Sequence, residues 1–517
     1  MSTKPGEASP GAAGNWPRWA LTTGDASPAV DPTTGKAASI EPASAIKNAG
    51  WSPFRVKLSR NIANWLQEYN YRWIRYLDQT AHRAATRVVA ASNADAESLR
   101  MADYVCDGTA DEVQINAAID AANAAGGGIV QLSEGTFTVT VTTGEVLLKS
   151  GVTLRGRGIG ATTIKVPTGG TDSGNAQRIV RNANASGDVG IGVEDLTIDG
   201  NRVNSTKSNV GLFLLEVARA RLRNVRVTGG NKSTNFGSYQ PAGFYLDGCT
   251  FATVDHCIAD DCDRFGWYIL DTTTDMDLVV SDCWATDCSA ESAGAADAVT
   301  FSGGGRLTLR RVIATGTNVG DGFDGGMALA VLDNCQAIGT RRGFNVTAGR
   351  LVGCRAVSCT VNSGFTTSGG AATFMRCVAT SNTQEGFVVD GGALVECEAT
   401  LNGRDGFYVA GRSFLRGCAA QSNAQDGGAT TYVGYRFTSA ADRSLMLGCT
   451  SITSVLTNKE KYAVHLETGS ADIVVAQCYL QKGVTTGNAG DAVQDDGTGN
   501  GTLPTDSSIS TGNKQYT

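Results

Sequence analysis

The residues of this sequence that could do acid–base chemistry include a group of aspartates near its centre. Asp297 lies 24 positions before Asp321, and Asp324 follows in the segment GDGFDGG. Cleavage of a glycosidic bond needs two carboxyl groups, about 5 Å apart when configuration is retained and roughly 6.5 to 9.5 Å apart when it is inverted. These three aspartates are the candidate catalytic group, provided that the fold places them on neighbouring segments.

A second set of carboxylates recurs at a fixed place in the sequence. Glu385, Asp405 and Asp426 each stand just before a Gly in successive similar segments. A residue repeated at one site of every segment favours a structural role, in which a carboxylate accepts backbone N–H bonds and Gly supplies a positive φ. We therefore expect these carboxylates to stabilise turns, and we place the chemistry at Asp297, Asp321 and Asp324.

Aromatic side chains could complete a carbohydrate site, because their faces stack on sugar rings while carboxylates and amides bind the hydroxyl groups. The alternative is that such a ring fills the core or a contact between subunits. The candidates are Trp267, Tyr268, Trp284, Tyr408 and Tyr432.

A repeat of about 20 residues must position these side chains. Its leading cysteines are Cys335, Cys354, Cys377, Cys397 and Cys418, at intervals of 19, 23, 20 and 21. Each unit is too short to enclose a core and contains brief strands broken by Gly or Asn, so the units must stack with their strands parallel. Parallel neighbours lie about 4.8 Å apart, so like residues form internal ladders. The pattern predicts a parallel solenoid over 128–481, with the Cys side chains acting as small buried apolar groups.

The start of this region predicts a capping helix within 106–127. In CDGTADEVQINAAIDAANAAGGGIVQLSEGTFTV, Asp111 is the expected N-cap, and Gly126 to Gly128 end the helix. This segment and the following GVTLRGRG closely resemble the opening of the pectate-lyase-like family of right-handed parallel β-helices. The resemblance implies that the helix covers the N-terminal end of the coil, and phage tail spikes are frequent members of that family.

The first 80 residues have a different character. Residues 1–58 are rich in Pro, Gly, Ser, Ala and Thr and predict an extended arm, whereas 59–80 predict a helix with a wide aromatic face. Little neighbouring sequence could cover this face, so we expect symmetric self-association or docking onto a larger assembly to bury it. The large anchors of the two segments are Trp16, Trp19, Trp51, Trp65, Tyr69 and Trp73.

The same stretch resembles the N-terminal attachment segment of many bacteriophage tail fibres and tail spikes. The order GNWPRWA, GWSPF and NWLQEYNYRWIRYLDQ carries the likeness, although the usual Lys-Pro-Pro before the helix is replaced by Arg55-Val56-Lys57-Leu58. The resemblance implies attachment to a tail or baseplate protein, a homotrimer, and a place in the virion after synthesis in the host cytoplasm. Many such spikes are endoglycosidases that use two or three Asp or Glu residues, while others are lyases or only bind.

Composition excludes several other classes of function. The net charge of -7 opposes nucleic-acid binding, and the sequence has no apolar run long enough to span a membrane. The polar start MSTKPGEASPGAAG lacks a signal-peptide core, so we expect reduced thiols. With no CxxC or HExxH, we expect no metal and no cofactor. Asp255, Asp260, Asp261 and Asp263 match no recognised calcium loop, and His256 is expected at the surface.

These observations predict an all-β protein: a right-handed single-stranded parallel β-helix of the pectate-lyase-like type, preceded by an arm and an aromatic helix. We expect a tail-spike or tail-fibre subunit that binds a bacterial surface polysaccharide, capsule or lipopolysaccharide, and that could cleave it. A non-catalytic fibre and a polysaccharide lyase or epimerase remain open as alternatives. The expected segments are 1–58 arm, 59–80 aromatic helix, 81–105 linker, 106–127 capping helix, 128–481 β-helix and 482–517 polar cap or tail.

Overall fold

The computed structural model describes residues 86–502 with short gaps. The gaps are 141–143, 170–176, 186, 206–208, 231–239, 274, 289–295, 317–319, 370–371, 427–431, 453–459 and 482–491. The predicted arm, the aromatic helix and their Trp and Tyr anchors therefore lie outside the described residues. Within the described residues, no helix is both long and apolar enough to cross a membrane.

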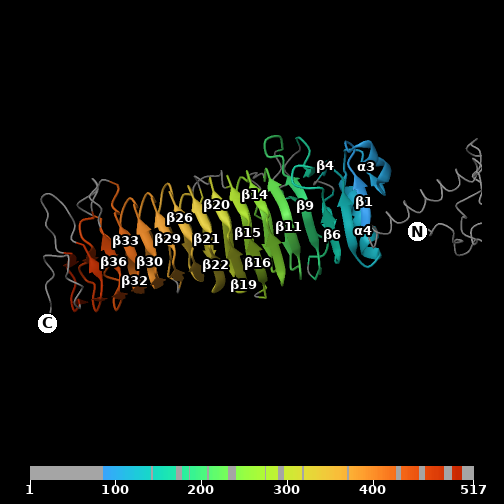
Figure 1. Ribbon diagram of the computed structural model, residues 1–517. Coiled ribbons are helices and arrows are strands. Elements are labelled where there is room, and N and C mark those ends of the chain that lie inside the picture. The colour runs from blue at the N-terminus through green and yellow to red at the C-terminus, as the bar shows by residue number, and fades with distance from the viewer. Residues whose placement is uncertain are drawn as a thin grey trace, which may run out of the picture. The chain divides into compact units, whose positions relative to one another are not determined.

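The strands wind into coils that stack along a single axis (Figure 1). Strands at the same place in successive coils pair in parallel and form three sheets, which we call faces 1, 2 and 3. Each coil adds one strand to each face, and the named strand pairs are parallel. Face 1 contains β5 (Val146–Leu148), β8 (Gln177–Asn182), β10 (Asn209–Leu215), β12 (Ala242–Asp247), β15 (Phe265–Asp271), β18 (Val299–Gly303), β21 (Phe323–Gly326), β24 (Phe344–Val346), β27 (Phe365–Thr366), the starts of β30 (Phe387–Val395) and β32 (Phe407–Arg416), β34 (Tyr435–Phe437), β37 (Val464–Leu466) and β40 (Val493–Asp495).

Face 2 contains β3 (Gly128–Leu132), β6 (Val152–Arg155), the starts of β9 (Gly192–Asp199) and β11 (Arg221–Thr228), β13 (Ala252–Asp255), β16 (Asp277–Ser281), β19 (Arg306–Arg310), β22 (Leu329–Asp333), β25 (Arg350–Val352), β28 (Thr373–Met375), the ends of β30 and β32, β35 (Leu445–Leu447), β38 (Val474–Ala476) and β41 (Gly501–Thr502). Face 3 contains β4 (Gly135–Thr138), β7 (Thr162–Lys165), the ends of β9 and β11, β14 (Ile258–Asp260), β17 (Trp284–Thr286), β20 (Ile313–Thr315), β23 (Gln336–Ile338), β26 (Arg355–Val357), β29 (Val378–Thr380), β31 (Glu398–Thr400), β33 (Ala419–Gln421), β36 (Thr450–Ile452) and β39 (Tyr479–Leu480).

Like residues stack inside the coil, as the repeat predicts. The residues directly after Cys335, Cys354, Cys377 and Cys397 are register partners on successive strands of face 3, so these cysteines form one file. A parallel aromatic file runs through face 1, with ring centroids 4.6 to 4.9 Å apart from Phe323 to Tyr435. All 14 cysteines are buried free thiols. The predicted ladder is therefore confirmed.

In the coils that contain the cysteine file, the backbone turns sharply at the residue directly before the file position, and we call this position the corner. The residue before the cysteine has a φ between about 50° and 62°, the left-handed region, whatever its type. Its N–H donates to a carbonyl of the next coil, as at Asn334 (2.8 Å) and Arg376 (2.9 Å). The non-glycine residues at this position from β16 onward are Asp282, Arg311 (where Val312 takes the place of the cysteine), Asn334, Arg376, Glu396 and Gln477.

The N-terminal end of the coil is covered by α4 (Glu112–Ala124), which lies within the expected segment 106–127 and packs against the first coils. Asp111 precedes α4 but makes no side-chain cap bond to it. Its buried carboxylate instead accepts from the N–H groups of Gly108 (2.9 Å) and Thr138 (2.7 Å), so it joins the loop to the first coil.

Both predicted ends of the β-helix need adjustment. From Thr86 onward, the expected linker 81–105 contains β1 (Thr86–Ala90), α3 (Ala96–Met101) and β2 (Tyr104–Val105), and β1 pairs with both β2 and β3. The coil also continues past 481, because β40 pairs with β37 and β41 pairs with β38. Small residues and polar composition concealed these strands, whose stability comes from pairing with the adjacent coil.

Candidate functional site

Face 1 presents one continuous row of outward side chains, which we call the outer row of face 1. Successive members are register partners, and the residues that alternate with them, such as Phe244 and Trp267, lie in the core. Leu147 and Arg181 precede the aromatic part of the row, and from β18 onward the row is mostly polar. From β10 to β37 its members are Phe213, Tyr245, Tyr268, Thr300, Asp324, Asn345, Thr366, Val388, Tyr408, Arg436 and His465.

Asp297 lies two residues before β18, and both of its carboxylate oxygens accept hydrogen bonds from neighbouring groups. Its Oδ1 accepts from the backbone N–H of Asp321 (2.9 Å), and Thr300 Oγ1 donates to its Oδ2 (3.2 Å). The side chain is only 8% exposed. Burial, and then the negative charges of Asp324 and Asp321, raise the pKa of Asp297 to about 7. This carboxyl group can therefore hold a proton near neutral pH.

Asp321 and Asp324 come from the next coil and differ in their surroundings. Asp321 is 2% exposed, and its Oδ1 accepts from Arg341 (Nε at 3.0 Å), while Arg342 lies 3.6 Å from Oδ2. Burial raises its pKa although the two guanidinium groups oppose this. Asp324 is half-buried on the outer row, where Asn345 Nδ2 donates to its Oδ1 (2.5 Å). The structure thus brings the three predicted aspartates together.

An aromatic cluster borders this group on the preceding coils. The ring of Tyr268 lies 4.7 Å from that of Phe265 and 5.2 Å from that of Tyr245. Tyr268 is the register partner of Thr300, which binds Asp297. The cluster is separate from the core, and Tyr268 is its half-buried ring, so it is the aromatic residue nearest to the aspartates on the outer row.

Trp267 must be removed from the predicted carbohydrate-binding residues. Its indole is 1% exposed, stacks on Phe244 at 4.0 Å, and donates through Nε1 to the carbonyl of Trp284 (3.0 Å). It points inward because side chains alternate along a strand, so its neighbour Tyr268 points outward. Trp284 is half-buried but lies on β17 of face 3, away from the outer row of face 1.

Tyr408 lies on the outer row beside a second polar group. Arg436 donates to both oxygens of Asp405 (2.6 and 3.2 Å) and to Glu467 (3.0 Å). Its NH1 also lies 3.4 Å from His465 Nδ1, and His465 Nε2 lies 3.0 Å from Asp496. Burial raises the pKa of Tyr408. Tyr432, the other aromatic candidate, lies under the Arg404 guanidinium at 5.8 Å.

Of the recurring carboxylates, Asp405 has the predicted backbone contact, since it accepts from the N–H of Val433 (2.7 Å) in addition to Arg436, whereas Glu385 accepts from Ser363 Oγ (2.9 Å). The positive φ expected of the following glycines is not found at Gly386 and Gly406, where an added Cβ would instead lie 2.7 Å from a carbonyl oxygen of the next coil. No local sequence pattern indicates the arginines that accompany the carboxylates, namely Arg341, Arg342 and Arg436. Their role could be recognised only after the coils were aligned, because each partner lies 20 to 31 residues away.

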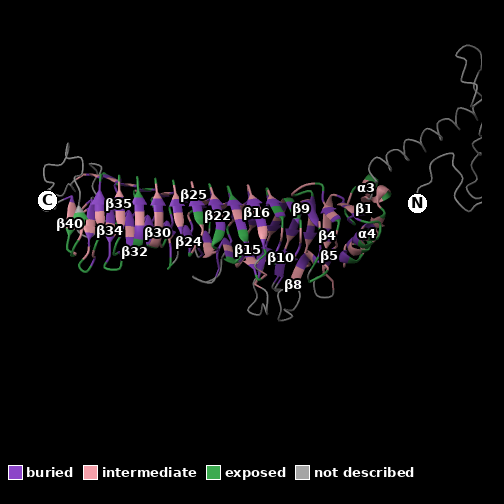
Figure 2. Ribbon diagram, turned by 90° about the horizontal axis from the view of Figure 1, so that it is seen from below, coloured by how far each residue is buried: buried purple, intermediate pink, exposed green. Residues whose placement is uncertain are grey.

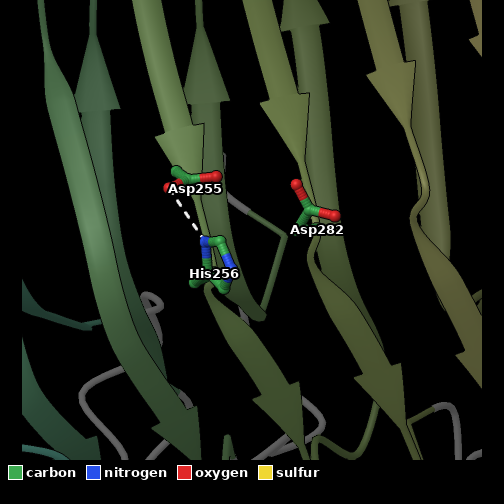
Figure 3. Close-up of side chains that lie close together, drawn as sticks. All are labelled: Asp255, His256 and Asp282. Carbon is green, nitrogen blue, oxygen red and sulfur yellow. Dashed lines mark ion pairs between the residues drawn. The ribbon is translucent and has the colours of Figure 1, made fainter.

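Asp255, His256 and Asp282 form a second cluster at a corner of the coil (Figure 3). One donor atom of each lies within 4.8 Å of the others. His256 Nδ1 is 2.9 Å from Asp255, and Arg311 donates to both oxygens of Asp282 (2.5 Å each), so a cation would have to displace Arg311. The other aspartates considered for calcium are paired with arginines, Asp260 with Arg226 and Asp261 and Asp263 with Arg202.

Comparison with known proteins gives a partial match to a fold and to several polysaccharide enzymes. Residues 127–311 match the sequence profile described as "Right handed beta helix region". Mannuronan C5-epimerase AlgE4 of Azotobacter vinelandii is 41% identical over 112 residues, which are 21% of this chain and 20% of that protein. Alginate lyase 7 of the same organism is 40% identical over 112 residues, 21% of this chain and 13% of that protein. The match therefore spans a small part of these relatives.

Solved structures with similar backbones have low sequence identity. The AlgE4 A-module of Azotobacter vinelandii is 20% identical with a TM-score of 0.43, over 79% of this chain and 97% of that one. The pre-mature gene product 12 of bacteriophage phi29 is 13% identical with a TM-score of 0.49, over 75% of this chain and 53% of that one. From the wound strands, the internal files and the matched profile, we conclude that the chain contains a right-handed parallel β-helix.

Proposed function

We propose that this chain is a bacteriophage tail-spike or tail-fibre subunit that binds a bacterial surface polysaccharide along face 1 and hydrolyses it. The observation that carries the hydrolytic part is Asp297: a buried carboxyl group with a pKa of about 7, one coil away from a second, more accessible carboxylate, Asp324. Glycoside hydrolysis uses two carboxyl groups, of which the one that acts as the acid has a raised pKa.

The contacts support different roles for the three aspartates. Asp297, protonated near neutral pH, would donate its proton to the glycosidic oxygen. Asp324 would act as the second carboxylate, and Asp321 would position Asp297 through its backbone N–H while remaining bound to Arg341 and Arg342.

Sugar binding is supported by the outer row next to the aspartates. Tyr268 lies on the preceding coil, and Asn345 and Thr366 follow on the next two. A polymer lying along the coil axis would meet a stacking ring, the carboxylates and then neutral hydrogen-bonding groups. The 40–41% identity over 112 residues to proteins named for mannuronan and alginate chemistry also supports a polysaccharide as the ligand.

The attachment part of the proposal rests on sequence resemblance. The segments GNWPRWA and NWLQEYNYRWIRYLDQ resemble tail-attachment segments, which supports a place in the virion, a tail or baseplate protein as partner, and a homotrimer. Incubation of purified tails with the wild-type chain and with a variant carrying Trp65→Ala and Trp73→Ala tests this. Attachment of both proteins with equal affinity would contradict it.

Hydrolysis is tested by incubating the protein with capsular and lipopolysaccharide preparations and measuring new reducing ends. We expect Asp297→Asn and Asp324→Asn to reduce the rate at least 100-fold. Asp333→Asn is the matched control, because Asp333 is a half-buried carboxylate on face 2 that pairs with Arg310. Equal rates for Asp297→Asn and wild type on a cleaved glycan would refute the assignment.

A lyase or epimerase is the second candidate, favoured by the identity to epimerases and to a lyase. Elimination would produce unsaturated sugars that absorb in the ultraviolet, and epimerisation would change the polymer without new ends. A chain that binds the glycan but leaves it unchanged, in both wild type and Asp297→Asn, would identify a non-catalytic fibre.

A further inference from the structure

Two arginines beside the outer row of face 1 lack the hydrogen bonds that other arginines of the coil make. Arg342 and Arg404 each have a buried Nε with no acceptor among the described residues. Each guanidinium group lies 3.6 Å from a carboxylate oxygen, of Asp321 and of Glu385 respectively, which is too far for a hydrogen bond. Arg311, by contrast, donates to both oxygens of its carboxylate partner.

Other groups bind the two neighbouring carboxylates. The Nε of Arg341 donates to Asp321 Oδ1 (3.0 Å), and the Nη2 of the same arginine lies 2.9 Å from that oxygen. Ser363 Oγ donates to Glu385 Oε2 (2.9 Å). The guanidinium groups of Arg342 and Arg404 are therefore held near a carboxylate without being fixed to it, and their N–H donors can bind a ligand.

Both arginines lie along the edge of face 1 that carries the aspartates. Arg342 stands two residues before Phe344, and Arg404 stands three residues before Phe407. These two phenylalanines are three coil steps apart, which is about 14 Å at 4.8 Å per step. The side chain of Arg342 is 21% exposed and that of Arg404 is 37% exposed. Figure 2 shows the strands of this face from β24 to β34, in which intermediate residues alternate with buried ones.

The surface between and beside the two arginines suits a sugar chain. Asn345 and Thr366 are neutral hydrogen-bonding members of the outer row on the intervening strands. The guanidinium carbon of Arg404 lies 5.8 Å from the ring centroid of half-buried Tyr432, so a charge and an aromatic ring are presented together. The planar fork of an arginine matches the two oxygens of a carboxylate or a phosphate group.

We propose that Arg342 and Arg404 bind acidic groups of the glycan, carboxylate or phosphate, at two places about 14 Å apart along the coil. The ligand is then an acidic polysaccharide. A neutral polymer would cover both guanidinium groups without supplying an acceptor, which disfavours its binding. Arg342 also offsets the negative charges of Asp321 and Asp324, which would otherwise repel an acidic chain at the candidate site. The inference rests on the proposed glycan binding along face 1, and it does not depend on hydrolysis.

The test measures the affinity of the full chain for immobilised capsular and lipopolysaccharide preparations. All proteins carry Asp297→Asn, so that hydrolysis does not remove the ligand. Each preparation is used untreated, after reduction of its carboxyl groups to alcohols, and after removal of its phosphate with hydrofluoric acid. Arg342→Gln and Arg404→Gln are compared with Arg355→Gln, which removes an exposed arginine of face 3 and changes the net charge equally. Arg342→Lys keeps the charge but not the fork.

We expect one of the two treatments to weaken binding tenfold or more, and that treatment identifies the acidic group. Arg342→Gln and Arg404→Gln should each weaken binding to the untreated glycan at least tenfold and leave binding to the treated glycan unchanged. Arg355→Gln should have no effect, and Arg342→Lys should recover part of the affinity. A chain that binds no preparation would overturn the proposed glycan binding and this inference with it. Binding that neither treatment weakens, or that both Gln substitutions leave unchanged, would overturn the inference alone.

Discussion

Replacing Asp297 with Asn should abolish cleavage and at the same time stabilise the protein at alkaline pH. The pKa of Asp297 is raised from 3.8 to about 7, so the folded state binds this proton more tightly than the unfolded state does. Stability contributed by this group is therefore present at low pH and is lost as the pH rises from about 4 to about 7. Each tenfold difference in proton affinity is worth about 1.4 kcal/mol, which makes the cost of the ionised form above pH 7 about 4 kcal/mol as an upper limit.

The Asn side chain fits the contacts of Asp297. Its carbonyl oxygen can still accept from the Asp321 N–H, and its amide can donate to Thr300 Oγ1, since a hydroxyl group both donates and accepts. The measurement is the urea midpoint of wild type, Asp297→Asn and the control Asp333→Asn at pH 4.5 and pH 8. We expect Asp297→Asn to gain stability over wild type at pH 8 and little at pH 4.5. An equal gain at both pH values, or a loss at pH 8, would refute the argument that ionisation of buried Asp297 opposes folding.

Three further predictions concern the interior. Phe365→Ala, which removes a ring stacked between Phe344 and Phe387, should lower the free energy of unfolding by about 3–5 kcal/mol, and Phe365→Leu by clearly less, in urea titrations. Glu460→Ala should lower the free energy of unfolding by about 3 kcal/mol, because it leaves the buried N–H and Nδ2 of Asn423 and the Oγ of Ser451 without their acceptor. Glu460→Gln keeps an acceptor and should lower it by less. Equal losses for the two variants would show that these hydrogen bonds contribute nothing to stability. The 14 buried thiols should react with Ellman's reagent only after denaturation, and rapid labelling of the native protein would contradict their placement.

The sequence was sufficient to predict the coil because each repeat unit packs against the units directly before and after it in the chain. A Cys or Phe every 19 to 23 residues can be buried only by stacking on its equivalent, so the spacing alone predicts the files through Cys354 and Phe365. The ends were less predictable, because strands β1 and β40 have no repeat signal of their own and are defined by the strands they pair with.

The candidate site was predictable only in part. Asp297 and Asp321 were correctly predicted to lie close together, because the 24 residues between them are about one coil and residues one coil apart stack on each other. Which of two adjacent aromatic residues faces outward depends on a one-residue register, so Trp267 and Tyr268 could not be distinguished before the pairing with Val299 and Thr300 was known. The arginine partners of Asp321 and Asp405 were also unpredictable, because nothing in the local sequence links them.

The left-handed corner before each cysteine has a further consequence. A sharp bend here is imposed by the coil above and below, at a cost of about 1 kcal/mol for a residue other than Gly, so acidic, basic and amide side chains all occupy it. Residues at these corners can therefore be substituted without changing the path of the coil. One edge of the rod could thus acquire a new surface charge, and with it different neighbours, while the interior remained unchanged.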